Sequence, residues 1–439
     1  MHEGTRILLA VPFDWGNKGD VAVCNSMIGA LSRVFGNADY MILALGRSVR
    51  PVPACKFKTI EYVEPSGTFR FLLTALKITV WAILYRLWGV SSFWVSGREH
   101  GLLTAYEKAD LILLPARDII STTYGVSSLI SDALFGMMIA VFAGKKTMVY
   151  AAQIGPFASG VAGRCAAFLS RQVLDRVDLI TVRGRISARW LRELGVRRPR
   201  VYVTADPAYL LPGISRMEAT ALLSKQSHST CDKPLVGINV SSLIWRFGFA
   251  QAGVSDDGGA RRERYIEGMV LASEFLVHEL GARVVLLPHV FGASHDDVAL
   301  CEEIRGRVEC GESVGVIREE REPEELKGII GLFDMFVAAR HHPLIHSVSQ
   351  GVPTIAIDYT FKMREVMEEL GCEEWVIDMA NFDAKDLIHR LRLLWSIRKE
   401  ARQRLLQRVD LLKQRALANA MLARELTLRT EAGALALER

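Results

Sequence analysis

The sequence predicts an α/β fold made of two doubly wound, parallel-sheet domains that face a cleft. Three observations lead to this prediction. The 439 residues exceed what a single hydrophobic core usually serves. Short apolar runs recur along the chain and alternate with helical stretches, which is typical of parallel sheets. Between residues 213 and 233 these runs stop, and Ser, Lys, Gln, His and Thr take their place, which indicates a linker.

The first predicted domain covers residues 1–212. It opens with a buried strand at 6–13, a glycine-containing loop, a helix from Val21 to about Phe35 and a second strand at 40–46. Later apolar runs predict further strands at 110–114, 147–151, 178–182 and 201–203. The stretches between them predict helices at 126–143, 160–176 and 185–194.

The second predicted domain covers residues 234–380, and an amphipathic helical region rich in Leu and Arg covers 381–439. Strands are expected at 235–241, 283–287, 314–317, 334–338 and 354–357, with helices at 261–280, 295–308, 323–331 and 343–350. Open α/β sheets bind ligands beyond the carboxyl ends of their strands, so functional side chains are expected in the loops that follow the strands.

Composition narrows the class of protein. The net charge is +5, but the arginines are spread along the chain instead of forming a stripe with aromatic residues, which argues against a nucleic-acid partner. The seven cysteines are odd in number and contain no CxxC pair, which argues against a disulfide framework and fits a reducing, cytoplasmic compartment. The first residues lack the pattern of a signal peptide and are interpreted as leading into the first strand.

Residues 69–95 form a very apolar segment that Lys77 and Arg86 interrupt, with eight uncharged residues between them. A spanning helix needs about 20 apolar residues, so the segment predicts a buried helix followed by a strand of the first domain. The alternative is a helix that lies on the inner face of the membrane with its basic residues reaching the head groups.

The motif Gly16-Asn17-Lys18-Gly19-Asp20 joins the first strand to the first helix. Glycines let the backbone approach a ligand closely, and a helix N-terminus offers free N–H groups. We expect Asn17, Gly19 and Asp20 to bind substrate hydroxyls, with Asp20 accepting a proton. The alternative is that Asp20 is simply the N-cap of the helix.

The motif Arg340-His341-His342-Pro343 follows a predicted strand and opens a helix. Pro343 fits the first helical position, which would put His342 at or next to the N-cap. A guanidinium, an imidazole and a helix N-terminus would then meet at the sheet edge. That combination suits a small dianion carrying phosphate and carboxylate, and histidine can supply a proton. His341 serves equally well as a polar cap of the turn.

Four further residues follow predicted strands and complete the candidate set. Lys362 would place a positive charge beside the same anion. Arg246 and His289 are expected on the same side, and Gln153 belongs to the first domain. His342 and His346 have the spacing of a helical metal pair, but no neighbouring carboxylate or cysteine completes a ligand set, so no metal is expected.

With these motifs in place, the sequence resembles the polysaccharide pyruvyl transferase family. The matching stretches come in the family's order from residue 16 to about 371, and they read GNKGD, AAQIGPF, ITVRGRISARWLRELGV, VTADPAYLL, VGINVS, VVLLPH and AARHHPLIHSVSQGVPTIAIDYTFK. The resemblance implies two Rossmann-like halves arranged as in GT-B glycosyltransferases. It also implies phosphoenolpyruvate as donor, with no cofactor, and a sugar or lipid-linked glycan as acceptor.

The resemblance assigns roles to these residues. The family's Arg-Leu-His motif reads Arg340-His341-His342 here, so Arg340 and His342 would engage the donor. His342 and Asp20 are the catalytic candidates; the donor-binding candidates are Arg340, His341, Lys362, Arg246 and His289. The acceptor-binding candidates are Asn17, Gly19, Asp20 and Gln153, which makes the first domain the acceptor side. The oligomeric state is not indicated.

Three departures from the family pattern keep other functions open. They are His341 in place of leucine, LLPARDIIST at 113–122 in place of a Gly-rich stretch, and Arg183-Gly184 in place of Arg-Asp. One alternative is a GT-B nucleotide-sugar glycosyltransferase in which Asp358 or Glu365 would close a ribose pocket. Another is a non-catalytic, glycan-binding member of the family.

Overall fold

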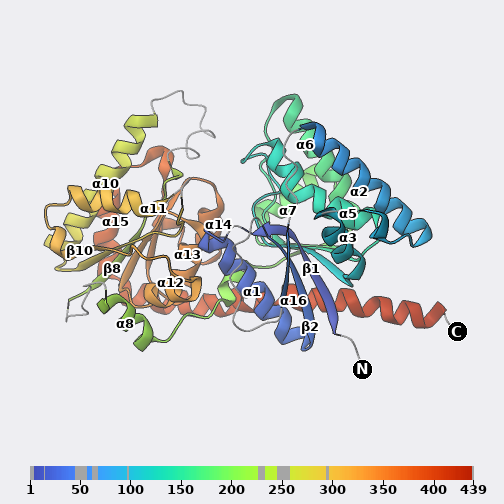
Figure 1. The fold of residues 1–439 in the computed structure, drawn as a ribbon. Coiled ribbons are helices and arrows are strands. Elements are labelled where there is room, and N and C mark those ends of the chain that lie inside the picture. The colour runs from blue at the N-terminus through green and yellow to red at the C-terminus, as the bar shows by residue number, and fades with distance from the viewer. Residues whose placement is uncertain are drawn as a thin grey trace. The chain divides into compact units, whose positions relative to one another are not determined.

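The computed structural model describes residues 4–13, 15–44, 57–61, 68–95, 98–225, 233–244, 258–292 and 296–437. The chain divides into two compact units, each built around a parallel β-sheet (Figure 1). Unit 1 comprises Met1–Trp15, Val23–Leu210 and Leu412–Arg439, and unit 2 comprises Gly16–Ala22 and Leu211–Leu411. Two stretches therefore group differently from the sequence-based boundaries: Gly16–Ala22 belongs with the second half, and Leu412–Arg439 with the first.

The described strands of unit 1 form a seven-stranded sheet in the order β3-β2-β1-β4-β5-β6-β7, and all neighbours pair in parallel. The order reverses between β1 and β4, as in doubly wound folds. The strands are β1 (Thr5–Phe13), β2 (Ala38–Ala44), β3 (Phe57–Glu61), β4 (Leu111–Leu114), β5 (Thr147–Ala152), β6 (Leu179–Val182) and β7 (Arg200–Val203).

Helices cover both faces of this sheet because successive side chains of a strand point to opposite sides. Ile7 and Leu9 of β1 belong to one core with α1 (Lys18–Phe35) and α16 (Arg398–Leu437). Leu8 and Ala10 belong to the other core, which the remaining helices of unit 1 cover. These are α2 (Thr68–Trp88), α3 (Arg98–Lys108), α4 (Val126–Ser128), η2 (Leu129–Leu134), α5 (Phe135–Phe142), α6 (Gly160–Leu174) and α7 (Arg185–Leu194), with the short 3-10 turn η1 (Ser92–Trp94). A second 3-10 turn, η3 (Pro207–Leu210), packs Leu210 against the core of Ile7 and Leu9.

The described strands of unit 2 form a six-stranded parallel sheet in the order β10-β9-β8-β11-β12-β13, which reverses between β8 and β11. Its central strands are buried along their whole length, as expected for a sheet covered on both faces. The strands are β8 (Leu235–Asn239), β9 (Arg283–Leu287), β10 (Val314–Val316), β11 (Met335–Ala338), β12 (Thr354–Asp358) and β13 (Val376–Asp378).

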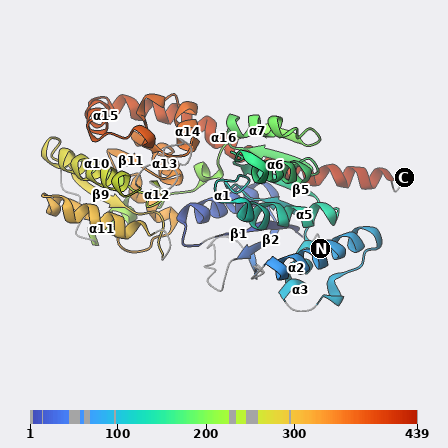
Figure 2. The ribbon, with the colours of Figure 1, turned by 90° about the horizontal axis from the view of Figure 1, so that it is seen from above.

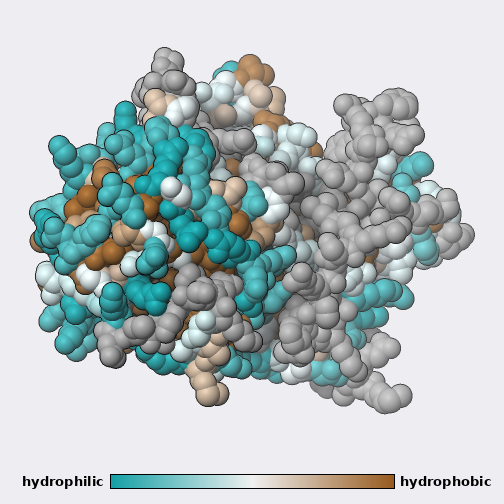
Figure 3. Space-filling model, turned by 60° about the vertical axis from the view of Figure 1, so that its left-hand side comes forward, coloured by the Kyte–Doolittle hydropathy of each residue, from teal (hydrophilic) through white to brown (hydrophobic). Residues whose placement is uncertain are grey.

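The helices of unit 2 pack on both sides of its sheet (Figure 2). α10 and α11 contact β9, whereas α13 and α14 contact β12 on the other side of the reversal. The helices are α8 (Arg216–Lys225), α10 (Gly258–His278), α11 (Asp297–Arg307), α12 (Pro323–Ile330), α13 (His341–Val348), α14 (Lys362–Glu369) and α15 (Ala384–Ser396), with 3-10 turns η4 (Gly311–Ser313), η5 (Glu373–Trp375) and η6 (Met379–Asn381). On the side drawn in Figure 3, hydrophilic side chains make up most of the described surface, with hydrophobic ones between them.

Outside the 69–95 segment, the predicted strands are all present, with ends that differ by at most two residues. β3 and β13 were not predicted, because β3 mixes charged and apolar residues and β13 is only three residues long. The expected linker contains α8, and the expected single helix at 126–143 includes the π-helical turn η2.

The apolar segment at 69–95 forms α2 and the short turn η1. The helix was predicted, but the strand expected after it is wrong, because Gly89 has a positive φ of 65° that ends the helix and the chain then makes a 3-10 turn. Across the described residues, no helix combines the length and the apolar character needed to cross a membrane.

Candidate functional site

The candidate site lies at the carboxyl edge of the unit 2 sheet, at the point where the strand order reverses between β8 and β11. Open α/β sheets bind ligands at such a reversal because the flanking helices run on opposite faces. Asn239 at the end of β8 ties the neighbouring strand ends together: its amide nitrogen donates to the Leu287 carbonyl at 2.9 Å, and its Oδ1 accepts the Ala339 N–H at 3.3 Å. Arg340 and His289 follow β11 and β9 directly.

α13 starts two residues earlier than predicted. Arg340 is the N-cap, His341 is the first helical residue, and the Leu344 N–H donates to the Arg340 carbonyl at 3.2 Å. The prediction that Pro343 occupies the first helical position is therefore wrong; it occupies the third. Proline is tolerated there because N–H groups of the first turn have no partner inside the helix. His342 lies in the first turn, near the positive end of the helix dipole.

Arg340 lies at the expected sheet edge, but its side chain is largely buried and paired. It is 8% exposed, and Nη2 donates to Oδ1 of Asp297 at 2.6 Å. Burial, the largest single influence, lowers the pKa of this guanidinium, but the charge and hydrogen bond of Asp297 together with Tyr359 and Tyr265 outweigh it and hold the pKa above its ordinary value. Arg340 therefore stays charged inside the protein.

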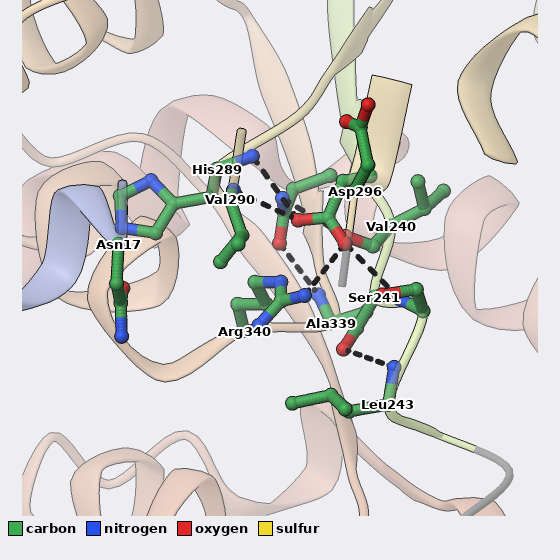
Figure 4. A network of polar contacts seen from close by, with 12 residues as sticks. Asn17, Val240, Ser241, Leu243, His289, Val290, Asp296, Ala339 and Arg340 are labelled. Atoms are coloured by element: carbon green, nitrogen blue, oxygen red, sulfur yellow. Dashed lines mark hydrogen bonds and ion pairs between the residues drawn. The ribbon is translucent and has the colours of Figure 1, made fainter. Parts of the chain in front are cut away.

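Asp297 organises the whole edge of the sheet and was not predicted from the sequence. Besides Arg340, its Oδ1 accepts the Ser242 N–H at 3.1 Å, and its Oδ2 accepts the N–H groups of His289 at 3.2 Å and Val290 at 3.0 Å. Segments that follow β8, β9 and β11 thus converge on one fully buried carboxylate (Figure 4). Its neighbour Asp296 is the N-cap of α11, so the sequence signal for both residues was that of a helix cap.

Four histidine rings cluster beside Arg340. The centroid of His289 is 6.3 Å from that of His342 and 5.8 Å from that of His346, and the His341 and His342 centroids are 5.2 Å apart. His289 is 2% exposed, and neither ring nitrogen has a hydrogen-bond partner within the described part of the chain. Burial holds the pKa of His289 well below its ordinary value, and the two neighbouring imidazoles lower it further.

The Gly16-Asp20 motif lies against these histidines, within unit 2. Asn17 forms an antiparallel bridge with Val290, the Lys18 N–H donates to the His289 carbonyl at 3.3 Å, and the Phe291 N–H donates to the Gly16 carbonyl at 3.2 Å. The structure therefore brings together two motifs that are more than half the chain apart, and it places the predicted acceptor-binding loop in the same unit as the predicted donor-binding residues.

Gly19 allows this approach. A Cβ atom built on Gly19 would lie 2.2 Å from Nδ1 of His342, a distance that real Cβ contacts do not show. The neighbouring Lys18 is 1% exposed, and its Nζ pairs with Glu320 Oε1 at 2.5 Å. A buried ammonium is expensive without such a partner. Lys18 contributes to lowering the pKa of His289.

Asp20 is not the N-cap of α1, so that alternative is wrong. The helix begins at Lys18, and Oδ1 of Asn17 accepts the Gly19 N–H at 3.0 Å, which makes Asn17 the residue in front of the helix. Asp20 lies in the first turn and is 7% exposed. A carboxylate there is stabilised by the helix dipole.

Lys362 is the first residue of α14, in the loop after β12. Phe361 before it has a positive φ of 48°, and the Lys362 N–H donates to the Thr360 carbonyl at 2.7 Å. Asp358 in the same loop is 5% exposed; burial raises the pKa of its carboxyl group, although the Thr360 N–H donates to its Oδ1 at 3.1 Å and works in the opposite direction. Tyr359 from this loop acts electrostatically on Arg340.

Gln153 lies in unit 1, within a separate buried cluster. Its Oε1 accepts Nε of Arg183 at 2.9 Å, and Nη1 of Arg183 donates to Oδ2 of Asp206 at 2.5 Å. Arg246 lies outside the described residues.

The model of one protein family, described as polysaccharide pyruvyl transferase, matches residues 17–360 of this chain. The chain belongs to this family. The match begins at Asn17 and ends at Thr360, so it includes both motifs that meet at the candidate site.

Individual proteins are also similar to this chain. The amylovoran biosynthesis protein AmsJ of Erwinia amylovora is 24% identical over 292 residues, which cover 65% of this chain and 66% of AmsJ, just under two thirds of the relative's length. The solved structure of S. aureus MnaA with UDP is similar with a TM-score of 0.57 and 12% identity, covering 94% of each chain. Anabaena Alr3699/HepE with UDP-glucose gives 0.56 and 12%, covering 97% of this chain and 100% of that one. These likenesses confirm the predicted GT-B-like fold class.

The candidate site contains residues that sequence reasoning missed, chiefly Asp297, Glu320 and the buried Lys18. Lys18 was visible only as part of a glycine-containing loop, and the two acidic residues lie in stretches whose charged composition is typical of exposed surface. Within the described residues, no group of three or more His, Cys, Asp or Glu side chains is arranged to hold a metal ion.

Proposed function

We propose that this member of the family transfers the pyruvyl group of phosphoenolpyruvate to two hydroxyls of a sugar, in a polysaccharide or its lipid-linked precursor, and so forms a ketal. One observation carries the proposal: the Gly16-Asp20 loop, His342 and Arg340 meet at the strand reversal of unit 2. This arrangement combines a fixed cation, a helix N-terminus, an imidazole and a carboxylate, which together suit an anionic donor and a hydroxyl acceptor.

The donor carries a phosphate and a carboxylate, so its site must be cationic. In the proposal, the positive end of the α13 dipole and the guanidinium of Arg340 bind these groups. Asp297 occupies only one nitrogen of Arg340 in the observed contacts, and Nε has no hydrogen-bond partner among the residues described. Lys362 and His341 supply further donors at the rim.

His342 acts as the general acid. It donates a proton to the methylene carbon of the donor, and the π electrons of the double bond form the new C–H bond. The central carbon, still bonded to the phosphate oxygen, becomes electron-poor and open to attack. Fixed positive charges around it stabilise the electron-rich phosphate and carboxylate without reorganising. The burial of His289 keeps that neighbouring ring neutral, so it does not compete electrostatically with a protonated His342.

The acceptor then adds in two steps. The oxygen of one sugar hydroxyl bonds to the central carbon, and its proton passes to Asp20. The bond between carbon and the phosphate oxygen breaks, and inorganic phosphate leaves with the electron pair and the proton held by Asp20. The second hydroxyl adds to the same carbon, and its proton restores His342. Asn17 and the close backbone at Gly19 orient the two hydroxyls.

The test is to incubate the chain with phosphoenolpyruvate and a panel of free and lipid-linked sugars, and to measure released phosphate and the mass of the product. His342→Ala should lower turnover by about a hundred- to ten-thousand-fold, the range of general acid catalysis. His389→Ala is the matched control, because it makes the same change at an exposed position of α15 in the same unit. An unchanged rate for His342→Ala would remove the proposed role.

Calorimetric titration separates the proposal from the glycosyltransferase alternative. Phosphoenolpyruvate should bind, and Arg340→Gln should weaken its binding. Binding of a nucleotide sugar without binding of phosphoenolpyruvate would favour the alternative. Absence of phosphate release with every acceptor would favour a non-catalytic, glycan-binding member.

A further inference from the structure

α2 carries a second apolar stripe that no part of the described fold covers. Leu76, Val80, Ile83 and Leu87 recur at intervals of four, three and four residues, so they share one face of the helix. Their exposed fractions are 61%, 41%, 43% and 62%. Trp88 at the end of the helix is 69% exposed. Large apolar side chains that are exposed together, and not singly, mark an interaction surface.

The opposite face of α2 fixes the direction of this stripe. Ile78, Trp81 and Ala82 are at most 1% exposed and belong to the core of unit 1, and Tyr85 packs against that core. Turning α2 to hide Leu76 or Leu87 would expose this buried set. α2 runs along the outside of unit 1 (Figures 1 and 2), so the stripe points to solvent.

α6 extends the apolar surface. Val161, Phe168 and Leu169 of α6 are 70%, 59% and 42% exposed. α5 contacts both α2 and α6, and all three helices pack on the same face of the unit 1 sheet. We call these eight side chains the apolar face: Leu76, Val80, Ile83, Leu87, Trp88, Val161, Phe168 and Leu169.

Cations border the apolar face. At 3.6 residues per turn, Lys77 and Arg86 fall on the two sides of the α2 stripe, and both are exposed. Long basic side chains in this position can lie along apolar surface while their charged ends reach polar groups. The exposed stripe and its flanking cations together match a surface that is apolar inside and anionic at its rim.

Arg86 also lines a pocket of about 610 Å³ together with three other basic residues, Lys145, Arg176 and Arg198. The two carboxylates that line the pocket, those of Asp175 and Asp178, already accept hydrogen bonds from the protein backbone. Asp175 accepts the N–H groups of Arg197 and Arg198 at 2.7 and 3.0 Å, which lower the pKa of its carboxyl group, and Asp178 accepts the Thr147 N–H at 2.8 Å. Lys145 donates to the Glu107 carbonyl at 2.6 Å. The pocket therefore has an excess of positive charge beside α2.

We propose that the apolar face and the Arg86 pocket bind the surface of an anionic phospholipid bilayer. The apolar side chains enter the boundary between head groups and acyl chains, Trp88 lies at the interface, and Lys77, Arg86 and the pocket contact lipid phosphates. α2 lies on the bilayer and does not enter it further, because its other face is part of the protein core. The inference is independent of the proposed reaction.

The test is sedimentation of the full-length chain with vesicles of phosphatidylcholine, with and without phosphatidylglycerol. The chain should bind the anionic vesicles more strongly. Ile83→Glu combined with Leu87→Glu should weaken binding at least about tenfold by removing apolar contact and adding like charge. Arg86→Gln should weaken binding to the anionic vesicles about fivefold and leave the weak binding to pure phosphatidylcholine unchanged.

Met217→Glu is the matched control, since Met217 is 81% exposed on α8 of unit 2, outside the apolar face. It should bind vesicles like the unsubstituted chain, and circular dichroism should show that every variant is folded. The proposal is overturned if the chain does not sediment with anionic vesicles, or if the double variant binds them as strongly as the unsubstituted chain. A dimer in analytical ultracentrifugation that the double variant dissociates, without vesicle binding, would also overturn it and assign the face to a second copy. None of these measurements depends on turnover.

Discussion

Each unit contains a buried arginine that follows a strand and pairs with an aspartate. Arg183 of unit 1 follows β6 and pairs with Asp206 at 2.5 Å, and Arg340 of unit 2 follows β11 and pairs with Asp297 at 2.6 Å. Both pairs are more than nine-tenths buried. By burial and charge alone, the two arginine-aspartate pairs are equivalent.

Their surroundings differ. In unit 1, two guanidinium nitrogens of Arg183 donate hydrogen bonds, one to Asp206 and one to Oε1 of Gln153, and the other oxygen of Asp206 accepts the Ala208 N–H at 2.9 Å. Nε2 of Gln153 has no hydrogen-bond partner among the described residues. In unit 2, Nε of Arg340 and both ring nitrogens of His289 have no hydrogen-bond partner among the described residues. Buried polar groups are normally satisfied, and exceptions concentrate at functional sites. Each cluster therefore contains an incompletely satisfied group. In unit 1 this group is an amide, whereas in unit 2 it is the arginine itself and a neighbouring imidazole, groups that suit an anionic ligand.

The largest expected effect comes from removing either aspartate. Asp297→Ala and Asp206→Ala each leave a buried arginine unpaired and should lower the free energy of unfolding by about 3–5 kcal/mol in urea titrations. Only Asp297→Ala should also abolish phosphate release under conditions where the chain is still folded. Equal loss of activity in Asp206→Ala would break the distinction between the two pairs.

Gly19→Ala should have the next largest effect, because its Cβ would overlap the His342 ring. Relieving that overlap should cost about 1–3 kcal/mol of stability, and turnover should fall as His342 is displaced. Gly29→Ala is the matched control on the same helix, since nothing lies within 4 Å of a Cβ built at that position. It should stabilise the chain by up to about 1 kcal/mol and keep full activity. Thermal unfolding and phosphate release measure both changes.

His289 should make the stability of unit 2 depend on pH. Its pKa in the folded chain lies well below the ordinary value of 6.5, so the unfolded chain binds a proton first as the pH falls. Stability should therefore be complete above about 6.5 and fall below it by up to about 1.4 kcal/mol per pH unit, until the folded-state pKa is reached. His289→Phe keeps a ring but cannot titrate. If urea titrations give this variant the same pH dependence, another group is responsible.

Lys18→Met should give the smallest effect. Lys18 is the last of the groups that lower the pKa of His289, so its removal should raise that pKa slightly. The loss of stability between pH 6.5 and lower pH should then shrink by a few tenths of a kcal/mol. The measurement compares how the free energy of unfolding changes with pH in the two proteins. Removal of the Lys18-Glu320 pair lowers that free energy by a similar amount at every pH, so it does not affect the comparison. A profile that steepens would contradict the assignment.

The sequence was most informative where local pattern decides structure. Continuous apolar runs gave the buried strands, and the loop after β11 had to place Arg340 and His342 at the carboxyl edge of the sheet. The start of α13 was harder, because Pro343 is acceptable at the first and at the third helical position.

The features that could not be predicted from the sequence depend on contacts between residues that are far apart along the chain. In the sequence, Asp297 is one of two adjacent aspartates with the pattern of a helix cap. Only the folded sheet brings the segments after β8, β9 and β11 into contact with its carboxylate oxygens. The Gly16-Asp20 motif is flanked by segments of unit 1, so its grouping with His289 and His342 follows from contacts across the sequence and not from its neighbours. β3 was missed because its charged residues mask the strand pattern.

The grouping of Gly16–Ala22 with unit 2 restricts how this gene can be cut or recombined. A fragment limited to residues 211–411 would be continuous, yet it would lack the seven residues that contact the His289 backbone and lie against the His342 ring. An exchange of carboxyl-terminal halves between two family members would pair a foreign loop with resident histidines. Such hybrids should be active only when Gly16–Ala22 is exchanged together with the carboxyl-terminal half, because both belong to unit 2.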